Sequence, residues 1–153
     1  MIRAFFSAVN VPSAEPPYDT ITLKITYPAA PTGSELENMT GVIPADQAQA
    51  PFPVVIFMPG INVEPTAYHW LAQELAHAGL VVVTYLWVAE EMPGYISVTP
   101  GVSIQAVMPG NYGTEPTCPA LQPILDHLKD QNQSDTSHRS EEHTSELQSR
   151  SDL

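Results

Sequence analysis

Two continuous apolar runs that flank a helix constrain the fold of this chain more than any other feature. Residues 54–58 and 80–85 are almost entirely apolar, and such runs are typical of parallel strands that are covered on both faces. Between them, Pro65 suits the first position of a helix, and Gly79 supplies a stop directly before the second run. A strand, a helix and a second strand joined this closely predict a βαβ unit, and therefore the α/β class.

The intervening helix carries one narrow apolar face. Its members fall at spacings of three and four, as one side of a helix requires: Ala67, Leu71, Leu75 and Ala78. We expect this face to lie on the sheet.

The remaining segments are less regular. Residues 20–27 alternate polar with apolar side chains, which predicts a strand with one solvated face. Residues 29–53 and 87–117 are rich in proline and glycine and read as long connections, the second being long enough to serve as a lid or binding loop. A second helix is predicted over residues 119–130, where leucine and isoleucine recur on one face.

The C-terminal segment differs from the rest of the chain. Residues 139–149 read RSEEHTSELQS, which is the codon-by-codon translation of a sequencing-library adapter strand, and residues 150–153 fit its continuation. We therefore expect residues 1–138 to be the N-terminal part of a longer domain, and residues 139–153 to be a disordered, non-native tail. An ordinary acidic tail is the alternative, and the codons of the source DNA would distinguish the two.

The charge balance excludes one class of partner. The formal net charge is −12, and it is −10 without the tail, which carries four carboxylates and two arginines. Before the tail only Arg3, Lys24 and Lys129 are cationic, so no basic stripe is available to neutralise a phosphate backbone. We do not expect nucleic acid to be a partner.

The single cysteine and the N-terminus are informative only in what they exclude. Cys118 cannot form an intrachain disulfide, and a structural thiol is favoured over a catalytic one because Thr117 and Pro119 offer no means of lowering its pKa. The apolar run at residues 4–9 is too short for a signal peptide or a membrane span. A cytoplasmic location is therefore expected.

The best match to a known pattern begins at the first apolar run. Residues 54–62 read VVIFMPGIN, residues 68–72 read YHWLA, and residues 75–83 read LAHAGLVVV. In these residues and their spacing the chain resembles the α/β-hydrolase branch of chlorophyllase, dienelactone hydrolase and platelet-activating-factor acetylhydrolase. The resemblance extends roughly over residues 53–130. It implies an incomplete α/β-hydrolase fold, a mostly parallel sheet with flanking helices, truncated before the nucleophile strand.

The resemblance also implies a function. Members of the family are serine hydrolases that cleave carboxylic esters through an acyl-enzyme and need no cofactor. The backbone N–H of Ile61 would donate to the oxyanion, with Pro59, Gly60 and Asn62 forming the rest of the loop. Pro59 stands where the family usually has histidine. The alternative is that Pro59 and Gly60 simply end the strand.

The catalytic triad itself is missing. No serine before the tail lies in a G-x-S-x-G turn, and the acid and histidine would follow later still. We therefore expect this chain to be inactive and the complete protein to act on a small-molecule ester. His143, Ser145 and Glu146 lie in the tail and cannot substitute for a triad.

Further side chains have both a functional and a structural interpretation. Trp87, Tyr95 and Tyr112 could line a substrate pocket, or could equally anchor the long loop. His69 and His77 share a helix face but lack a third ligand, so no metal site is predicted.

One pair of carboxylates and two alternative functions complete the interpretation of the sequence. The adjacent Glu90 and Glu91 are best read as a surface pair. A non-catalytic binding module of the same family would share every feature visible in the sequence. An unrelated α/β domain that binds a phosphorylated ligand at residues 59–63 is disfavoured by the absence of a glycine-rich phosphate motif and by Glu64. The oligomeric state stays open.

Overall fold

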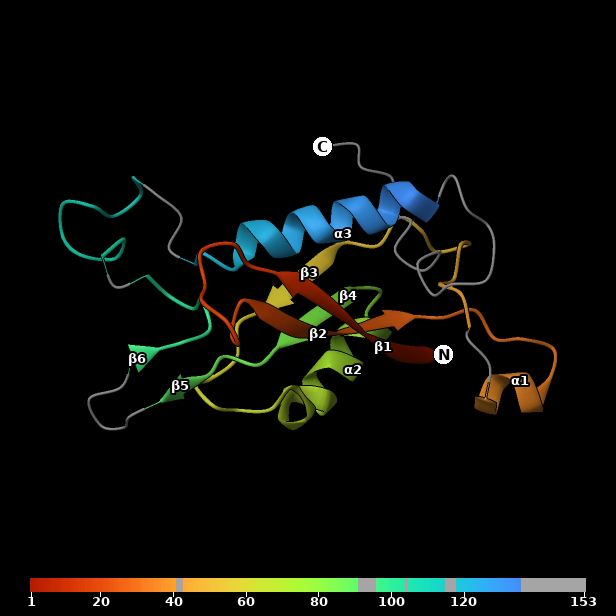
Figure 1. Ribbon diagram of the computed structural model, residues 1–153. Coiled ribbons are helices and arrows are strands. Elements are labelled where there is room, and N and C mark those ends of the chain that lie inside the picture. Colours follow the sequence, from red (N-terminus) through yellow and green to blue (C-terminus); the bar gives the residue numbers. More distant parts are fainter. Residues whose placement is uncertain (41–42, 91–95, 104, 115–117, 136–153) are drawn as a thin grey trace.

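A computed structural model of the chain describes residues 1–40, 43–90, 96–103, 105–114 and 118–135. The predicted tail at residues 139–153 lies outside these ranges. In the described residues the main sheet has four strands in the spatial order β1-β2-β4-β3 (Figure 1). Their bounds are Ile2–Asn10 for β1, Thr20–Pro28 for β2, Val54–Phe57 for β3 and Val81–Tyr85 for β4.

The sheet is mixed. β1 and β2 form an antiparallel hairpin in which Asn10 lies opposite Thr20, and the Val11 N–H donates to the Asp19 carbonyl oxygen over 2.7 Å at its turn. β2 is also antiparallel to β4. Among the described strands only β3 and β4 run parallel, with Val54 opposite Val81.

The predicted α/β-hydrolase fold, with a mostly parallel sheet and flanking helices, is therefore wrong. Two of the three strand pairings in the described main sheet are antiparallel. The apolar runs correctly predicted the one parallel pair, but β1 was not predicted at all. A short turn can join only antiparallel strands, so the hairpin fixes β2 in the direction opposite to β1, and pairing with β4 continues this alternation.

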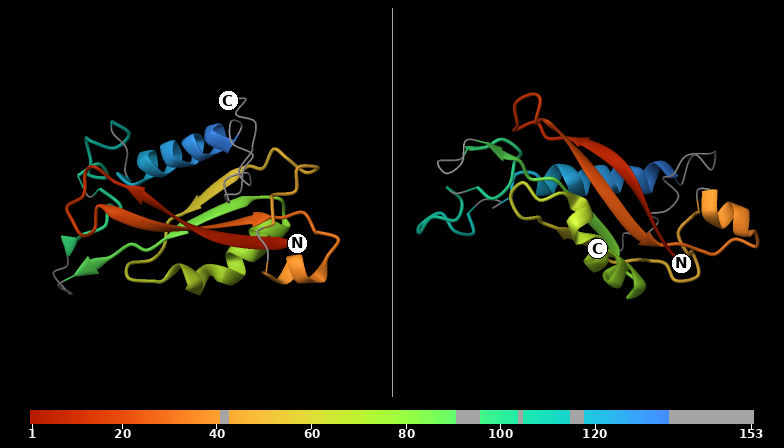
Figure 2. Two further views of the ribbon diagram at one scale, coloured as in Figure 1. Left: turned by 45° about the vertical axis from the view of Figure 1, so that its right-hand side comes forward. Right: turned by 90° about the horizontal axis from the view of Figure 1, so that it is seen from below.

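The βαβ unit is confirmed. A 3-10 turn, η1 (Pro65–Tyr68), leads into α2 (His69–His77), and Gly79 adopts a φ of +89°, which a residue without a Cβ reaches most easily. Figure 1 and the left view of Figure 2 show α2 on one face of the sheet and α3 (Leu121–Asp135) on the other.

The apolar face predicted for the first helix is wrong in phase. The buried residues of α2 are Ala72 and Ala76, whereas Leu71 and Leu75 are only half-buried. The segment begins as η1, and a 3-10 turn has three residues per turn instead of 3.6. A face counted from Ala67 as uniform α-helix therefore does not continue in phase into α2.

Two segments that were expected to be irregular contain short elements. The connection at residues 29–53 includes α1 (Glu35–Thr40). The loop at residues 87–117 includes β5 (Ala89–Glu90) and β6 (Ile96–Ser97), which pair antiparallel. The predicted second helix is confirmed as α3 and extends beyond residue 130.

The hydrophobic core lies between the sheet and α3. Leu23, Ile25, Val83 and Ile124 are fully shielded from solvent within it. Cys118 is buried there, with its sulfur 3.7 Å from the Tyr85 hydroxyl oxygen, as a structural thiol would be. Burial, together with the neighbouring thiol, raises the pKa of Tyr85 above its ordinary value.

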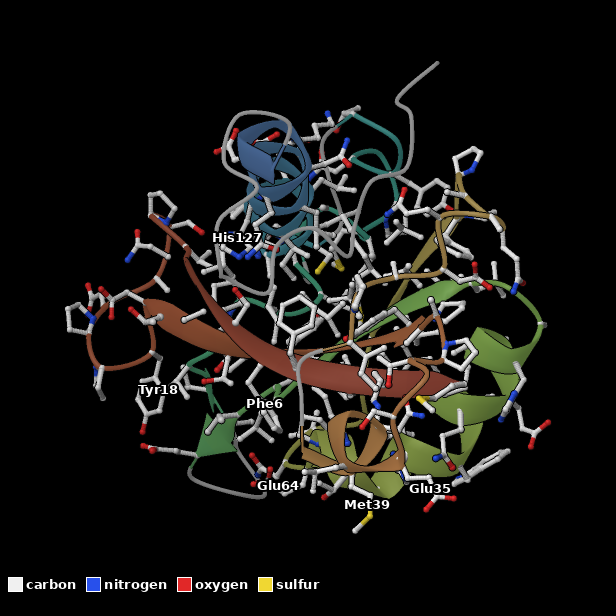
Figure 3. The ribbon with its side chains drawn as sticks, turned by 90° about the vertical axis from the view of Figure 1, so that its right-hand side faces the viewer. Phe6, Tyr18, Glu35, Met39, Glu64 and His127 are labelled. Atoms are coloured by element: carbon white, nitrogen blue, oxygen red, sulfur yellow. The ribbon has the colours of Figure 1, made fainter. Side chains whose placement is uncertain are left out.

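One polar cluster joins α3 to the sheet. His127 Nε2 lies 2.8 Å from Ser7 Oγ on β1, and the Gln131 side-chain amide donates to the same oxygen over 3.0 Å. Figure 3 places His127 between α3 and β1. Partial burial lowers the pKa of His127, and the opposing effect of Asp130 is smaller. A neutral His127 can therefore accept a hydrogen bond from the Ser7 hydroxyl at Nε2.

Acidification is expected to weaken this junction. Because the pKa of folded His127 lies below its ordinary value of 6.5, the unfolded chain binds the proton more readily, and protonation favours unfolding. The contribution of His127 to stability is complete above about pH 6.5 and is lost as the pH falls toward the lowered pKa. Urea unfolding at pH values from about 7.5 down to about 5, which lie on both sides of the ordinary histidine pKa, checks this expectation.

The matched variants are His127→Gln and His77→Gln. The first should reduce the pH dependence of the unfolding free energy, whereas the second replaces an exposed histidine at the end of α2 and should leave that dependence in place. An unchanged slope in His127→Gln would show that another group controls it.

Candidate functional site

The site begins where β3 ends. Residues 59–62, called the 59–62 loop below, leave the carboxyl end of β3 and form a parallel bridge between Ile61 and Trp87, just beyond β4. Pro59 is buried and Gly60 is exposed. Figure 1 shows this end of β3 on the same side of the sheet as β5 and β6. The loop thus lies at the carboxyl edge of the one parallel strand pair.

Tyr68 holds the first half of the loop. The Gly60 N–H donates to the Tyr68 hydroxyl oxygen over 2.8 Å, and the Tyr68 ring packs on Phe57 at a centroid distance of 4.7 Å. A Cβ on residue 60 would lie 3.2 Å from both Tyr68 Oη and Val63 Cγ2. Glycine therefore allows the close approach of this backbone to its own clamp.

Asn62 holds the second half. Its φ is +57°, in the left-handed region that asparagine tolerates better than most residues. Its side chain exchanges two hydrogen bonds with Ala89, donating to the carbonyl oxygen over 2.8 Å and accepting from the N–H over 2.9 Å. Its own N–H donates to the Trp87 carbonyl oxygen over 2.7 Å. The loop is thereby fastened to the chain that follows β4.

The hydrogen bonds that fix the 59–62 loop do not use all of its backbone N–H groups. The N–H groups of Gly60 and Asn62 are both engaged, and Pro59 has none. No hydrogen bond among the described residues uses the N–H of Ile61. A fixed loop with one unused backbone donor can stabilise negative charge on a ligand oxygen without rearranging.

Sequence reasoning identified the 59–62 loop but missed Tyr68 and the role of the Asn62 side chain. The only signal for Tyr68 was an aromatic residue at the start of the helix, which is a weak one. For Asn62 the signal was an asparagine after Pro59-Gly60, a type that favours positive φ. Their partners lie 8 and 27 positions away in the sequence.

The aromatic residues proposed for a pocket have different surroundings. Trp87 is half-buried, and its indole N–H donates to Ser97 Oγ. Gly101 packs against the same ring so closely that a Cβ there would lie 2.1 Å from Cε2. Tyr112 is 77% exposed and so contributes no wall, and Tyr95 lies outside the described residues.

A cavity of about 630 Å³ opens beside Trp87. Its walls come from the turn between β1 and β2, called the 13–18 turn below, from residues 96–103, called the 96–103 segment, and from Pro119. Ser97 and Gly101, which contact Trp87, belong to this lining. The Trp87 ring therefore supports the cavity wall from behind.

Tyr18 belongs to the lining of the cavity, and its hydroxyl has a partner on β5. It donates to the Glu90 carboxylate on β5, and this bond raises the pKa of Tyr18. Figure 3 shows Tyr18 extending from the 13–18 turn toward β5 and β6. Glu90 thus has a partner, whereas Glu91 lies outside the described residues.

The remaining candidates are not assembled into a site. His69 and His77 are exposed on α2, and within the described ranges no three His, Cys, Asp or Glu side chains are grouped so as to hold a metal ion. Over the same ranges no helix combines the length and apolar character needed to cross a membrane.

Comparison of the chain with protein-family models, curated proteins and solved structures gives no match. A function for this chain is therefore inferred from the geometry of the 59–62 loop and of the cavity.

Proposed function

We propose that this chain is the N-terminal part of a serine hydrolase that cleaves carboxylic esters through an acyl-enzyme, as its resemblance to chlorophyllase, dienelactone hydrolase and platelet-activating-factor acetylhydrolase implies. The observation that carries the proposal is the N–H of Ile61, which has no acceptor among the described residues and lies on a loop that is clamped on both sides. A small-molecule ester as partner and a cytoplasmic location belong to the same proposal.

The chemistry requires such a donor. When a nucleophile attacks an ester carbonyl, negative charge develops on the carbonyl oxygen, and preorganised N–H groups stabilise it. In this proposal Ile61 supplies one donor, and the residue that follows the nucleophile supplies the other. Gly60 and Asn62 cannot compete for this role because Tyr68 and Trp87 already accept their N–H groups.

The outer edge of β3 is where the nucleophile strand would pair. β3 has only β4 as a strand partner among the described residues, and Val54 on this edge strand is 40% exposed. A strand added in parallel there would end at the same edge of the sheet as the 59–62 loop. A serine following that strand would then lie close to Ile61.

The test compares this chain with the product of the complete reading frame. We expect the complete protein to hydrolyse p-nitrophenyl butyrate and to be labelled by a fluorophosphonate on a serine after residue 138. We expect neither reaction from this chain, because a hydrolase without its triad retains only the contributions of binding and the oxyanion hole. Labelling of this chain, or an unlabelled complete protein without turnover, would refute the proposal.

A non-catalytic binding module is the second candidate. The observation that favours it is a cavity formed entirely by residues of this chain, which needs no downstream segment to exist. A complete protein that binds esters without turnover and lacks a G-x-S-x-G serine would establish this alternative.

A further inference from the structure

We propose that the cavity between the 13–18 turn and the 96–103 segment binds an apolar ligand that carries no negative charge. The proposal that the cavity binds a ligand depends on the cavity alone. Its assignment as the pocket for the uncharged chain of an ester substrate rests on the proposed function.

The size and lining of the cavity suit a small, partly apolar molecule. Its volume of about 630 Å³ lies within the range of roughly 300 to 1,000 Å³ that is common for ligand sites. Apolar wall is supplied by Ala14, Val98, Val102 and Pro119. Hydroxyl groups are supplied by residues on both sides, which can orient an uncharged polar end.

Among the described residues that line the cavity, the only charged side chain is acidic. Glu15 is the one carboxylate in the lining, and the Tyr18 hydroxyl beside it holds a second carboxylate, Glu90. None of the cations before the tail, Arg3, Lys24 and Lys129, belongs to the lining. A ligand carboxylate would therefore meet repulsion without a compensating ion pair.

Trp87 provides a direct reporter for this site. It contacts two lining residues, Ser97 through its indole N–H and Gly101 through its ring. The second tryptophan, Trp70, lies on α2 and is 66% exposed. Trp70→Phe leaves Trp87 as the single source of indole fluorescence.

The experiment titrates the Trp70→Phe chain with three ligands that share one alkyl chain: hexan-1-ol, hexyltrimethylammonium and hexanoate. We expect saturable fluorescence changes with the alcohol and the ammonium ion, and binding of hexanoate weaker by about tenfold or more. Glu15→Gln should bring hexanoate to within about threefold of hexanol. The matched control Glu74→Gln removes an exposed carboxylate of α2 and should leave the preference unchanged.

A steric variant checks that the alcohol occupies this cavity. Val102→Phe adds bulk to the lining at a partly exposed position and should abolish the hexanol response while the chain stays folded by circular dichroism. Hexanoate binding as tight as hexanol, or no saturable binding of any ligand, would overturn the inference. Binding together with an inactive complete protein would instead refute only the esterase proposal.

Discussion

Replacing Asn62 with alanine is expected to lower the free energy of unfolding by about 2 to 4 kcal/mol. Alanine is strained at the observed φ of +57°, and it cannot form the two hydrogen bonds that join the Asn62 amide to Ala89. The loss of both also releases the 59–62 loop from the chain after β4. Urea unfolding followed by circular dichroism measures the difference.

Asn62→Gly separates the two causes. Glycine accepts the left-handed conformation but lacks the side-chain amide, so its cost should be smaller than that of alanine by about 1 kcal/mol. If Asn62→Ala were as stable as the parent chain, the amide clamp would contribute nothing and the loop would have to be fixed by other contacts. In the complete protein, Asn62→Gly should lower kcat more than it raises KM, because a loosened donor affects the transition state first.

Replacing Gly101 with valine is expected to destabilise the chain by about 1 to 3 kcal/mol. The Cβ of any side chain at this position would lie 2.1 Å from Cε2 and 2.4 Å from Nε1 of Trp87. The indole ring or the 96–103 segment must move to make room, and the hydrogen bond from Trp87 to Ser97 would be lost with that movement. Unfolding in urea and the emission maximum of Trp87 report the two effects.

Gly33→Ala is the control for adding a Cβ at a glycine whose surroundings are open. No heavy atom lies within 4 Å of a Cβ built on Gly33, so this substitution should stay within about 0.5 kcal/mol of the parent chain. Combining Gly101→Val with Trp87→Leu should recover part of the loss, because the two sites are in direct contact. A fully stable Gly101→Val would mean that Trp87 is not packed as described.

The central secondary structure could be predicted because its signals are local. The unbroken apolar run that became β4 reflects burial on both faces, and Gly79 at φ +89° reflects a helix end. The run that became β3 predicted the strand correctly but not its burial, because β3 lies at the edge of the described sheet and its residues are exposed or half-buried. β1 could not be predicted in the same way. Its residues alternate between exposed and half-buried positions, a weak pattern at the edge of the sheet, and its stability comes from pairing with β2.

The sequence predicted where the candidate site lies, but not the contacts that fix its loop. The 59–62 loop follows a strand that the sequence marks clearly. The clamps that fix it come from Tyr68 and from the chain around Trp87 and Ala89, and contacts of this kind depend on how separate segments pack. For the same reason Tyr112, which its place in the long loop suggested as a pocket residue, is exposed to solvent.

The sequence by itself determined the parallel βαβ unit, and it determined that Pro65 begins and Gly79 ends its helical segment. It also determined the excess of acidic residues, in keeping with a described cavity lining that contains no lysine or arginine. These follow from local preference and from composition. Only the tertiary structure decided that the hairpin of β1 and β2 makes the sheet mixed. It also decided that, among the described residues, the N–H groups of Gly60 and Asn62 have acceptors and that of Ile61 has none. Strand direction and hydrogen-bond partners are settled between distant segments, where burial and backbone pairing are satisfied together.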